Sequence, residues 1–305
     1  MSASSATPRR LTVNDIARRH ADGQRLATIT AYDYPTARIL DAAGVPLILV
    51  GDSLGQVALG YDTTVRVTMA EMLHHTKAVV RGTERALIVG DMPFLSYSTV
   101  DDALENAGRF LQEAGAQAVK VEGGVRSARI IEALVKAGIP VMGHIGWTPQ
   151  AQHGMGGTVK VQGRDRAAAR ALLADALAVQ EAGAFAIVLE LMPTQLAAAV
   201  TERLRIPTIG IGAGAGCDGQ IQVVTDVLGL GEFVPRHASP FADLRTVIAD
   251  AVARYIADVE AGTFPGEAQS VRMDDAVLDE VLGRGDHDRV AGDMPAGGIP
   301  LDRDL

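Results

Sequence analysis

The stretch LIVGDMPF, residues 87–94, is an apolar run that ends on an aspartate, Asp91. LILVGDSLG, residues 47–55, repeats this pattern with Asp52. Such runs are typical of strands that are buried on both faces, where an unpaired acidic side chain is unfavourable. Two identical V-G-D endings therefore indicate one structural position that the fold uses twice.

A repeating unit becomes visible when the chain is aligned on its turns. A helical pattern ends in a small-residue stop, as in DAAGVP, QEAGAQ, VKAGIP and QEAGAF, and a short apolar run follows. The glycine of each stop suits the left-handed position that closes a helix. Seven strand candidates result: RLATITAYD (25–33), LILVGD (47–52), ALIVGDMPF (86–94), AVKVEGG (118–124), VMGHIGW (141–147), AIVLELMP (186–193) and TIGIGAG (208–214).

Helix candidates lie between these strands, at residues 70–81, 100–114, 127–137, 166–182 and 195–205. Alternating strands and helices predict a parallel sheet. With an eighth strand placed around residues 231–235, the pattern predicts an α/β fold of the (β/α)₈ TIM-barrel type, and an open doubly wound sheet is the alternative. In a barrel, functional groups lie at the carboxyl ends of the strands, which accounts for Asp52 and Asp91.

Composition bounds the domain organisation. The chain has 305 residues, of which 48% are hydrophobic, enough for one large domain at residues 11–265. Residues 1–10 are expected to be a flexible N-terminus. Residues 266–305 hold ten acidic and four basic residues, which is −6 of the total charge of −9, and we expect an acidic, mobile tail there.

The same numbers bear on partners and location. The remaining charge of −3 on residues 1–265 includes no basic stripe, so a nucleic-acid partner is not expected. The sequence contains neither an apolar run of membrane-spanning length nor a signal-peptide core in MSASSATPRR, which favours a cytoplasmic protein without a membrane partner. Cys217 is the only cysteine, which excludes an internal disulfide.

Five successive strand candidates end in an ionisable group. Because alternate side chains in a strand share a direction, Ile48 and Val50 are expected to point with Asp52, and Leu87 and Val89 with Asp91. The other strands contribute Lys120 with Glu122, His144, and Glu190.

Asp52, Asp91 and Glu122 are expected to converge. Three neighbouring carboxylates repel one another, so a proton or a cation must lie among them. Oxygen ligands favour Mg²⁺, which keeps waters that a bidentate substrate can displace. The alternative is that each acid caps a loop or pairs with an arginine.

Three further residues have candidate roles. Lys120 could bind a substrate carboxylate, form a Schiff base or make an internal ion pair, and nearby acids favour its protonated form. His144 could hydrogen-bond the substrate or be a satisfied core residue. Glu190, between two leucines, is the best candidate for a general base, because apolar surroundings raise the pKa of a carboxylate; the alternative is a hydrogen-bond partner inside the barrel.

Two loops also stand out. GIGAGAGCDGQ, residues 210–220, could bind phosphate at a helix N-terminus, although closely spaced glycines are a weak signal. Residues 148–166 are too many for a simple turn and could form a lid over the catalytic face.

The chain resembles the ketopantoate hydroxymethyltransferase family. The resemblance rests on nine motifs in order over residues 11–261: TAYDYPTA, VGDSLG, VTMAEMLHHTKAVVRG, GDMPF, VKVEGG, GHIGWTPQ, GGTVKVQG, LELMP and IPTIGIGAG. It implies a barrel of the phosphoenolpyruvate/pyruvate superfamily, assembled as a homodecamer or a related oligomer. It also implies transfer of a one-carbon unit from 5,10-methylenetetrahydrofolate to 3-methyl-2-oxobutanoate, giving 2-dehydropantoate for pantothenate synthesis through a Mg²⁺-stabilised enolate.

The resemblance assigns roles residue by residue. Asp52 and Asp91 match metal ligands that also contact the substrate, and Glu122 matches a third acidic partner of Mg²⁺, directly or through water. Ser53, Lys120 and His144 match substrate-binding residues, and Glu190 matches the catalytic base.

Some positions depart from the family pattern. They are Trp147, Leu191, Met192, the segment PRHASPFADL (235–244) and the acidic tail. None of them removes a proposed catalytic group. A lyase or mutase of the same superfamily is the alternative function, although the K-K-C-G-H motif of isocitrate lyases is absent from the sequence. An inactive scaffold is disfavoured, because it would have little reason to retain buried charges.

Overall fold

The computed structural model describes residues 9–284. The chain divides into two compact units, Met1–Arg245 and Thr246–Leu305. The first unit carries every predicted site residue. The division expected from the sequence, a barrel domain at residues 11–265 and a tail from residue 266, stays a prediction.

The first unit is a closed barrel of eight parallel strands in chain order. β1 pairs with β2 and also with β8, where Leu26 lies opposite Gly219, and this second pairing closes the sheet. The (β/α)₈ prediction is therefore confirmed, and the open-sheet alternative is wrong. The strands are β1 (Leu26–Thr30), β2 (Leu47–Val50), β3 (Leu87–Asp91), β4 (Ala118–Glu122), β5 (Val141–Gly146), β6 (Ala186–Glu190), β7 (Thr208–Ile211) and β8 (Gly219–Gln222).

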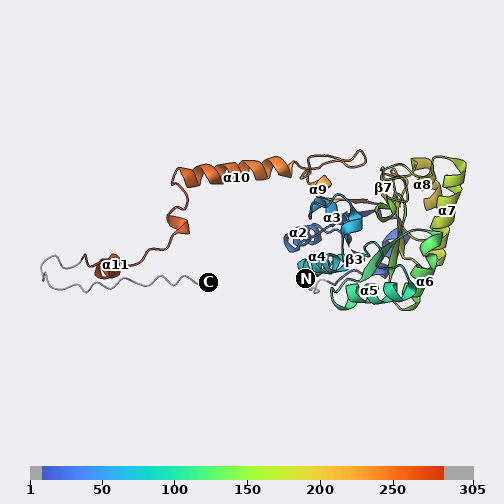
Figure 1. Cartoon of the computed structure of the whole chain (residues 1–305), viewed down its shortest axis with the longest axis horizontal. Helices are drawn as coiled ribbons and strands as arrows, with labels where there is room; N and C mark the ends of the chain where they lie inside the picture. The colour runs from blue at the N-terminus through green and yellow to red at the C-terminus, as the bar shows by residue number, and fades with distance from the viewer. Residues whose placement is uncertain (1–8, 285–305) are drawn as a thin grey trace, which may run out of the picture. The chain divides into compact units, whose positions relative to one another are not determined.

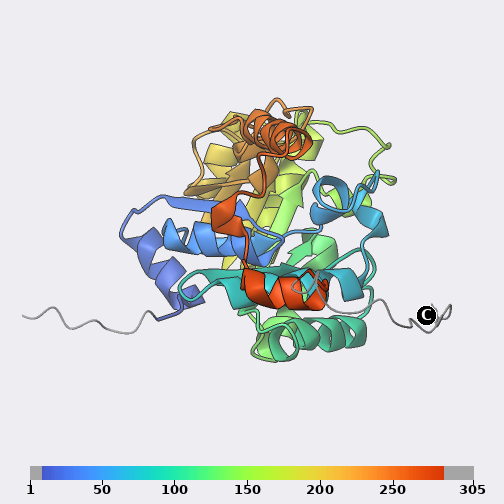
Figure 2. The ribbon, with the colours of Figure 1, turned by 90° about the vertical axis from the view of Figure 1, so that its left-hand side faces the viewer.

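Helices surround this sheet (Figures 1 and 2). All five predicted helices are present, with ends that differ by zero to four residues. Capping boxes define two of these five starts, Thr68 with Glu71 and Thr99 with Asp102, because each pair satisfies free amides of the first turn. The helices are α1 (Val13–Ala21), α2 (Tyr34–Ala42), α3 (Leu54–Val57), η1 (Thr64–Arg66), α4 (Met69–Gly82), α5 (Val100–Gln112), η2 (Val125–Ser127), α6 (Ala128–Lys136), η3 (Pro149–Ala151), α7 (Arg166–Glu181), α8 (Thr194–Thr201) and α9 (Val224–Val227).

The strands separate two apolar layers. Leu49 and Val89 belong to an inner cluster inside the barrel, whereas Ile48 and Val50 pack in an outer cluster with the helices. The prediction that Ile48 and Val50 point with Asp52 is therefore wrong. β2 ends at Val50, and the chain turns before Asp52, so the alternation of the strand does not extend to that residue.

The predicted eighth strand around residues 231–235 is also wrong. That segment is irregular, and β8 is the sequence GQIQ at Gly219–Gln222. β8 is only four residues long and half polar, so its strand conformation depends on pairing with β1 and β7. Consequently the glycine-rich residues 210–220 lead into a strand, and the helix N-terminus that a phosphate site would need does not follow them.

The second unit contains α10 (Leu244–Glu260), which begins just before it, followed by η4 (Glu267–Gln269) and α11 (Asp275–Val281). None of these helices has a buried residue. η4 and α11 lie in the segment predicted as a tail, and residues 285–305 of that prediction lie outside the described residues.

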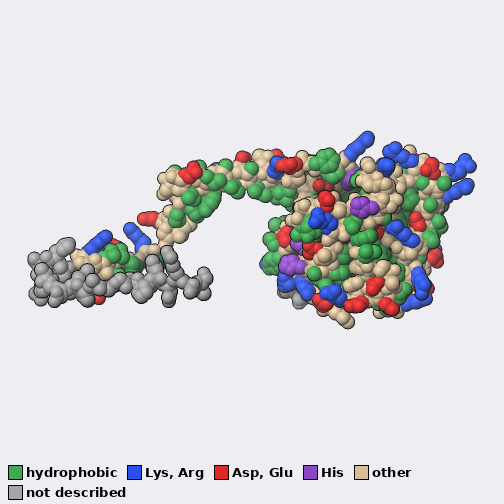
Figure 3. Space-filling model, viewed as in Figure 1, with side chains coloured by type: hydrophobic (Ala, Val, Ile, Leu, Met, Phe, Trp, Pro, Cys, Tyr) green, Lys and Arg blue, Asp and Glu red, His purple; other side chains and the backbone are tan. Residues whose placement is uncertain are grey.

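Two surface properties are relevant to partners. Within residues 9–284, no helix is long and apolar enough to cross a membrane. On the face of the first unit seen in Figure 3, basic and acidic side chains are interspersed.

Candidate active site

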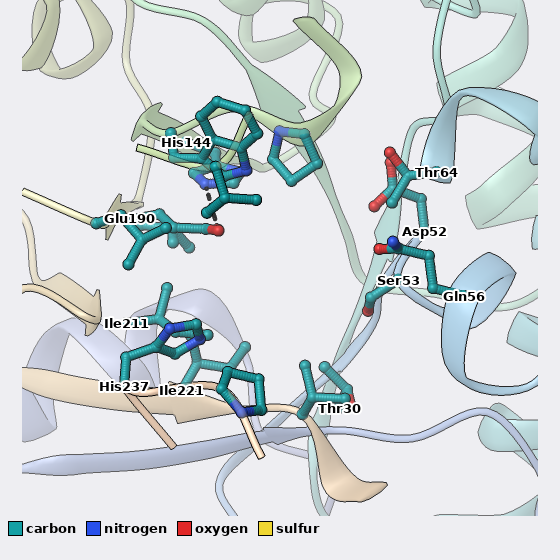
Figure 4. Close-up of a pocket in the computed structure, with 18 of the residues that line it drawn as sticks. Thr30, Asp52, Ser53, Gln56, Thr64, His144, Glu190, Ile211, Ile221 and His237 are labelled. Carbon is teal, nitrogen blue, oxygen red and sulfur yellow. Dashed lines mark ion pairs between the residues drawn. The ribbon is translucent and has the colours of Figure 1, made fainter. Parts of the chain in front are cut away.

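The predicted site residues line one pocket of about 700 Å³ in the first unit. Asp91 ends β3, Lys120 and Glu122 lie on β4, His144 lies on β5 and Glu190 ends β6. Asp52 and Ser53 follow β2 and line the same pocket. In Figure 4, Glu190 and His144 face Asp52 and Ser53 across the cavity.

Lys120 lies at the centre of the charged residues. Its Nζ is 2.8 Å from Asp91 Oδ1, 3.7 Å from Glu122 Oε1 and 3.2 Å from His144 Nδ1. Burial acts to lower the pKa of Lys120, but Asp91, Glu122 and Asp52 outweigh it and raise that pKa. The ammonium form leaves no free electron pair for a Schiff base, which favours an electrostatic role.

Asp52 and Asp91 are adjacent. The backbone amide of Asp52 donates to Asp91 Oδ2 at 3.1 Å, and both residues are at most 4% exposed. Burial, with added repulsion from Asp91 and Glu122, raises the pKa of Asp52 well above its ordinary range. Burial likewise raises the pKa of Asp91, although Lys120 opposes it. This pair is therefore stabilised by taking up either a proton or a cation.

Gln150, which the sequence analysis missed, holds these carboxylates in place. Its side-chain Nε2 donates to Asp52 Oδ2 and to the Met92 carbonyl, both at 2.9 Å. Its backbone amide donates to Glu122 Oε2 at 3.2 Å. The Tyr97 hydroxyl donates to Gln150 Oε1 and so fixes which side of the amide faces Asp52. The sequence signal was weak, a glutamine two residues after a strand-end Trp-Thr pair.

The charge of Glu122 is stabilised inside the protein. The side chain is only 1% exposed, and burial acts to raise its pKa. Lys120, His144 and the Gln150 amide outweigh burial and lower the pKa of Glu122. Glu122 is therefore ionised in the described site.

His144 links the buried acids to Glu190. Its Nδ1 lies 3.4 Å from Glu122 Oε1, and its Nε2 lies 3.1 Å from Glu190 Oε2 (Figure 4). Burial and Lys120 act to lower the pKa of His144, but the two glutamates raise it to about 9. The imidazolium thus orients Glu190, whose side chain is 16% exposed against 4% for His144.

The backbone around Glu190 is tightly defined. A side chain at Gly146 would place its Cβ 2.1 Å from the Glu190 carbonyl oxygen, and the Trp147 amide donates to that oxygen. Leu191, the next residue, has a φ of 46° in the left-handed region, which costs about 1–2 kcal/mol for a residue with a side chain. The local structure thus fixes the direction in which Glu190 leaves its strand.

Ser53 and the predicted lid complete the pocket. Ser53 Oγ lies 2.9 Å from the Tyr32 hydroxyl. Residues 148–166 contain η3 and then turns, and several of them line the pocket. The Gln162 amide donates to the Leu191 carbonyl at 2.7 Å, so this segment is tethered next to Glu190.

The carboxylates do not form a ready-made metal cage. Within residues 9–284, no three His, Cys, Asp or Glu side chains are arranged to hold a metal ion. The carboxylates of Asp52, Asp91 and Glu122 nevertheless outnumber the two neighbouring cations, Lys120 and His144. Glu122 Oε1 is buried without a hydrogen bond. This arrangement fits Mg²⁺, which typically uses one or two carboxylates together with waters and substrate oxygens.

Ionisable groups that five strand ends bring to one pocket of a closed parallel barrel define a (β/α)₈-barrel enzyme that acts on a small molecule. The profile of the ketopantoate hydroxymethyltransferases matches residues 10–267. The chain belongs to this family.

Curated relatives agree over most of the chain. A 3-methyl-2-oxobutanoate hydroxymethyltransferase of Chloroflexus aurantiacus is 62% identical over 278 residues, which is 91% of this chain and 98% of the relative. The enzyme of the same name from Gluconacetobacter diazotrophicus is 56% identical, over 90% of this chain and 99% of its own length.

Solved structures support the fold. Phosphonopyruvate hydrolase in complex with oxalate and Mg²⁺ has a TM-score of 0.55 at 13% identity and covers 90% of this chain and 96% of its own. 2,3-Dimethylmalate lyase, a member of the phosphoenolpyruvate mutase/isocitrate lyase superfamily, has a TM-score of 0.54 at 16% identity. The match covers 90% of this chain and 95% of the lyase chain.

Proposed function

We propose that this enzyme transfers a hydroxymethyl group from 5,10-methylenetetrahydrofolate to 3-methyl-2-oxobutanoate and forms 2-dehydropantoate, a precursor of pantothenate and coenzyme A. Family membership supports the overall reaction. The observation that carries the mechanism is the Glu190–His144 pair, which faces Asp52 and Ser53 across the pocket (Figure 4).

The acid cluster comprises Asp52, Asp91, Lys120, Glu122 and His144, and it would bind the 2-oxo acid. The positive charges of Lys120 and His144 favour an anionic substrate at this end of the pocket. The Ser53 hydroxyl could donate a further hydrogen bond to a substrate oxygen.

Asp52 and Asp91 would hold Mg²⁺, with Glu122 as a further partner through water. When bound, this ion would supply Lewis-acid stabilisation for negative charge on the keto oxygen. Gln150 and Lys120 orient the two aspartates for this purpose through the contacts described above.

Glu190 would act as the base that removes the proton from C3 of the 2-oxo acid. Its carboxylate lines the pocket, is partly exposed and is oriented by His144 Nε2. Water would cleave the two C–N bonds of the methylene group, releasing tetrahydrofolate and leaving a formaldehyde unit that carries the water oxygen. The carbanion would attack the carbonyl carbon of this unit and form the new C–C bond, and the resulting alkoxide would take up a proton to become the hydroxyl group.

A turnover assay tests this function. With 3-methyl-2-oxobutanoate, methylenetetrahydrofolate and Mg²⁺, the folded enzyme should release tetrahydrofolate together with 2-dehydropantoate. Consumption of the 2-oxo acid without release of tetrahydrofolate would instead indicate a lyase or mutase. Glu202→Gln, which changes an exposed glutamate outside the pocket, is a suitable control for handling and folding.

The assembly and the location are inferred from the family. We expect a homo-oligomer, with a decamer as the specific form, acting in the cytoplasm. Light scattering coupled to size-exclusion chromatography would measure the assembly, and cell fractionation would measure the location.

A further inference from the structure

The pocket is much larger than the 2-oxo acid requires. A cavity of about 700 Å³ is suited to a drug-sized ligand, whereas 3-methyl-2-oxobutanoate has only five carbon atoms. The acid cluster occupies one part of the lining. Another part, here called the second wall, consists of Ile211, Ile221, Asp226 and His237.

Asp226 is a carboxylate without a partner. It lies in α9, lines the pocket and is partly buried, and no hydrogen bond or ion pair to its side chain is present within residues 9–284. Burial raises the pKa of Asp226, and the neighbouring His237 acts in the opposite direction. A partly desolvated carboxylate that accepts no hydrogen bond is unfavourable unless a ligand supplies donors.

The part of the pocket around His237, the residue that acts electrostatically on Asp226, suits a flat ring. Ile211 and Ile221 are at most 8% exposed, and in Figure 4 they lie beside His237 on one wall of the cavity. Apolar side chains and an imidazole present surfaces on which a planar heterocycle can pack. This wall therefore combines apolar contact with one acceptor group.

Two cations lie among the lining residues on exposed segments. Lys160 belongs to residues 148–166, and Arg236 follows Pro235. Both side chains are exposed, and neither makes an ion pair within the part of the chain that the structure describes. They could bind an anionic group at the end of a long ligand.

A reduced folate matches this arrangement. Its pterin ring presents the N3–H and the 2-amino group side by side, and a carboxylate can accept both hydrogens with its two oxygens. The opposite end of the molecule carries the carboxylates of glutamate, which require cations. The pocket lining offers both kinds of group, a partly buried acceptor and exposed cations.

We propose that the second wall is the binding site of the reduced folate, with Asp226 accepting the N3–H and 2-amino hydrogens of the pterin. Ile211, Ile221 and His237 contact the ring, and Lys160 and Arg236 attract the glutamate carboxylates. This assignment rests on the proposed function, since it places the second substrate of that reaction.

Binding measurements on the whole protein test the site. Titration calorimetry with tetrahydrofolate, under anaerobic conditions, should show affinity reduced by about 10- to 100-fold in Asp226→Asn, the loss typical of a charged hydrogen-bonded pair. The control is Asp22→Asn, the same change at an exposed C-cap outside the pocket, and it should bind like the parent. Parent-like affinity in Asp226→Asn would overturn the proposal.

A second ligand separates the two ends of the site. A tetrahydropterin without the benzoylglutamate tail should also lose affinity in Asp226→Asn. Arg236→Gln and Lys160→Gln should lower the affinity for tetrahydrofolate by a few fold. They should leave the affinity for the tailless pterin unchanged. Weakening of both ligands by the cation variants would overturn the assignment of the tail.

Exchange at C3 separates this proposal from the proposed function. Solvent deuterium should enter C3 of 3-methyl-2-oxobutanoate without any folate, and Asp226→Asn should retain that exchange. Absence of exchange in the folded parent would defeat the proposed mechanism, whereas the calorimetry would still decide whether Asp226 binds the pterin. Loss of exchange in Asp226→Asn, with intact tetrahydrofolate binding, would show that Asp226 acts in proton removal from the 2-oxo acid and would overturn its assignment to the pterin.

Discussion

The acid cluster and the second wall line the same pocket but are built differently. In the acid cluster, Lys120 pairs with Asp91, and His144 pairs with Glu122. Gln150, which Tyr97 orients, donates hydrogen bonds to Asp52 and Glu122. In the second wall, Asp226 has no such partner within residues 9–284. The difference teaches that buried charge in this barrel is either preorganised by the protein or left for a ligand to satisfy.

Glu190 contacts His144 of the acid cluster and lies opposite Ile211 of the second wall in the β6–β7 pairing. Its replacement should have the largest effect. Glu190→Gln keeps the shape and removes the proton acceptor, so exchange at C3 and turnover should both fall by about 10²- to 10⁴-fold. Binding of the 2-oxo acid should change little. Deuterium incorporation followed by NMR gives the exchange rate, with Glu202→Gln as control. Equal exchange rates in the variant and the parent would show that another group is the base.

Removal of Lys120 from the acid cluster should lower the stability of the protein far more than removal of the Asp226 charge from the second wall. Lys120→Met leaves Asp91 and Glu122 without their central cation and should lower the free energy of unfolding by about 3–5 kcal/mol. Asp226→Asn should change it by less than about 0.5 kcal/mol, because no contact is lost. Denaturant titration of the metal-free protein measures both, and Lys136→Met controls for loss of an exposed lysine. Similar effects of the two site variants would remove the distinction.

The stability of the acid cluster should depend on pH through His144. The pKa of His144 is raised from 6.5 to about 9 in the folded state, so its contribution is complete below about pH 6.5. The contribution should be lost as pH rises through about 9, and the total is about 3 kcal/mol. Denaturation at a series of pH values, without metal, would show this decline. His144→Gln should lack it, and an identical decline in that variant would assign the effect to another group.

The smallest effect should come from Tyr97, which acts only through Gln150. Tyr97→Phe removes the donor to Gln150 Oε1 and lets the amide rotate away from Asp52. We expect about tenfold weaker divalent-metal affinity, measured by electron paramagnetic resonance with Mn²⁺. Tyr34→Phe, at an exposed tyrosine, is the matched control. An unchanged Mn²⁺ affinity in Tyr97→Phe would show that Gln150 does not need this hydroxyl.

Local sequence patterns were sufficient for most of the barrel. β1 to β7 are apolar runs bounded by small-residue stops, and Asp91, Lys120, Glu122, His144 and Glu190 all lie inside a strand, where alternation applies. Asp52 lies beyond its strand, so alternation named the wrong companions while its place in the pocket was predicted correctly. β8 could not be found from its own residues, because its pairing partners, β1 and β7, define it.

The supporting residues were harder to predict for a different reason. Gln150 and Tyr97 are neutral, and they lie 53 positions apart in the chain. Their importance arises only when the barrel brings β2, β3 and η3 together around Asp52. Asp226 gave no signal, because it lies outside the predicted strands and helices, and a single aspartate there is ordinarily a solvated residue.

Closure of the barrel through β1 and β8 also constrains how the enzyme is made. About 190 residues separate Leu26 from its partner Gly219. A ribosome that adds roughly 5–20 residues per second needs about 10–40 s to cover that distance, and β1 has no neighbour on one edge during this interval. The nascent chain is therefore exposed to misassembly until β8, one of its least apolar strands, has been synthesised.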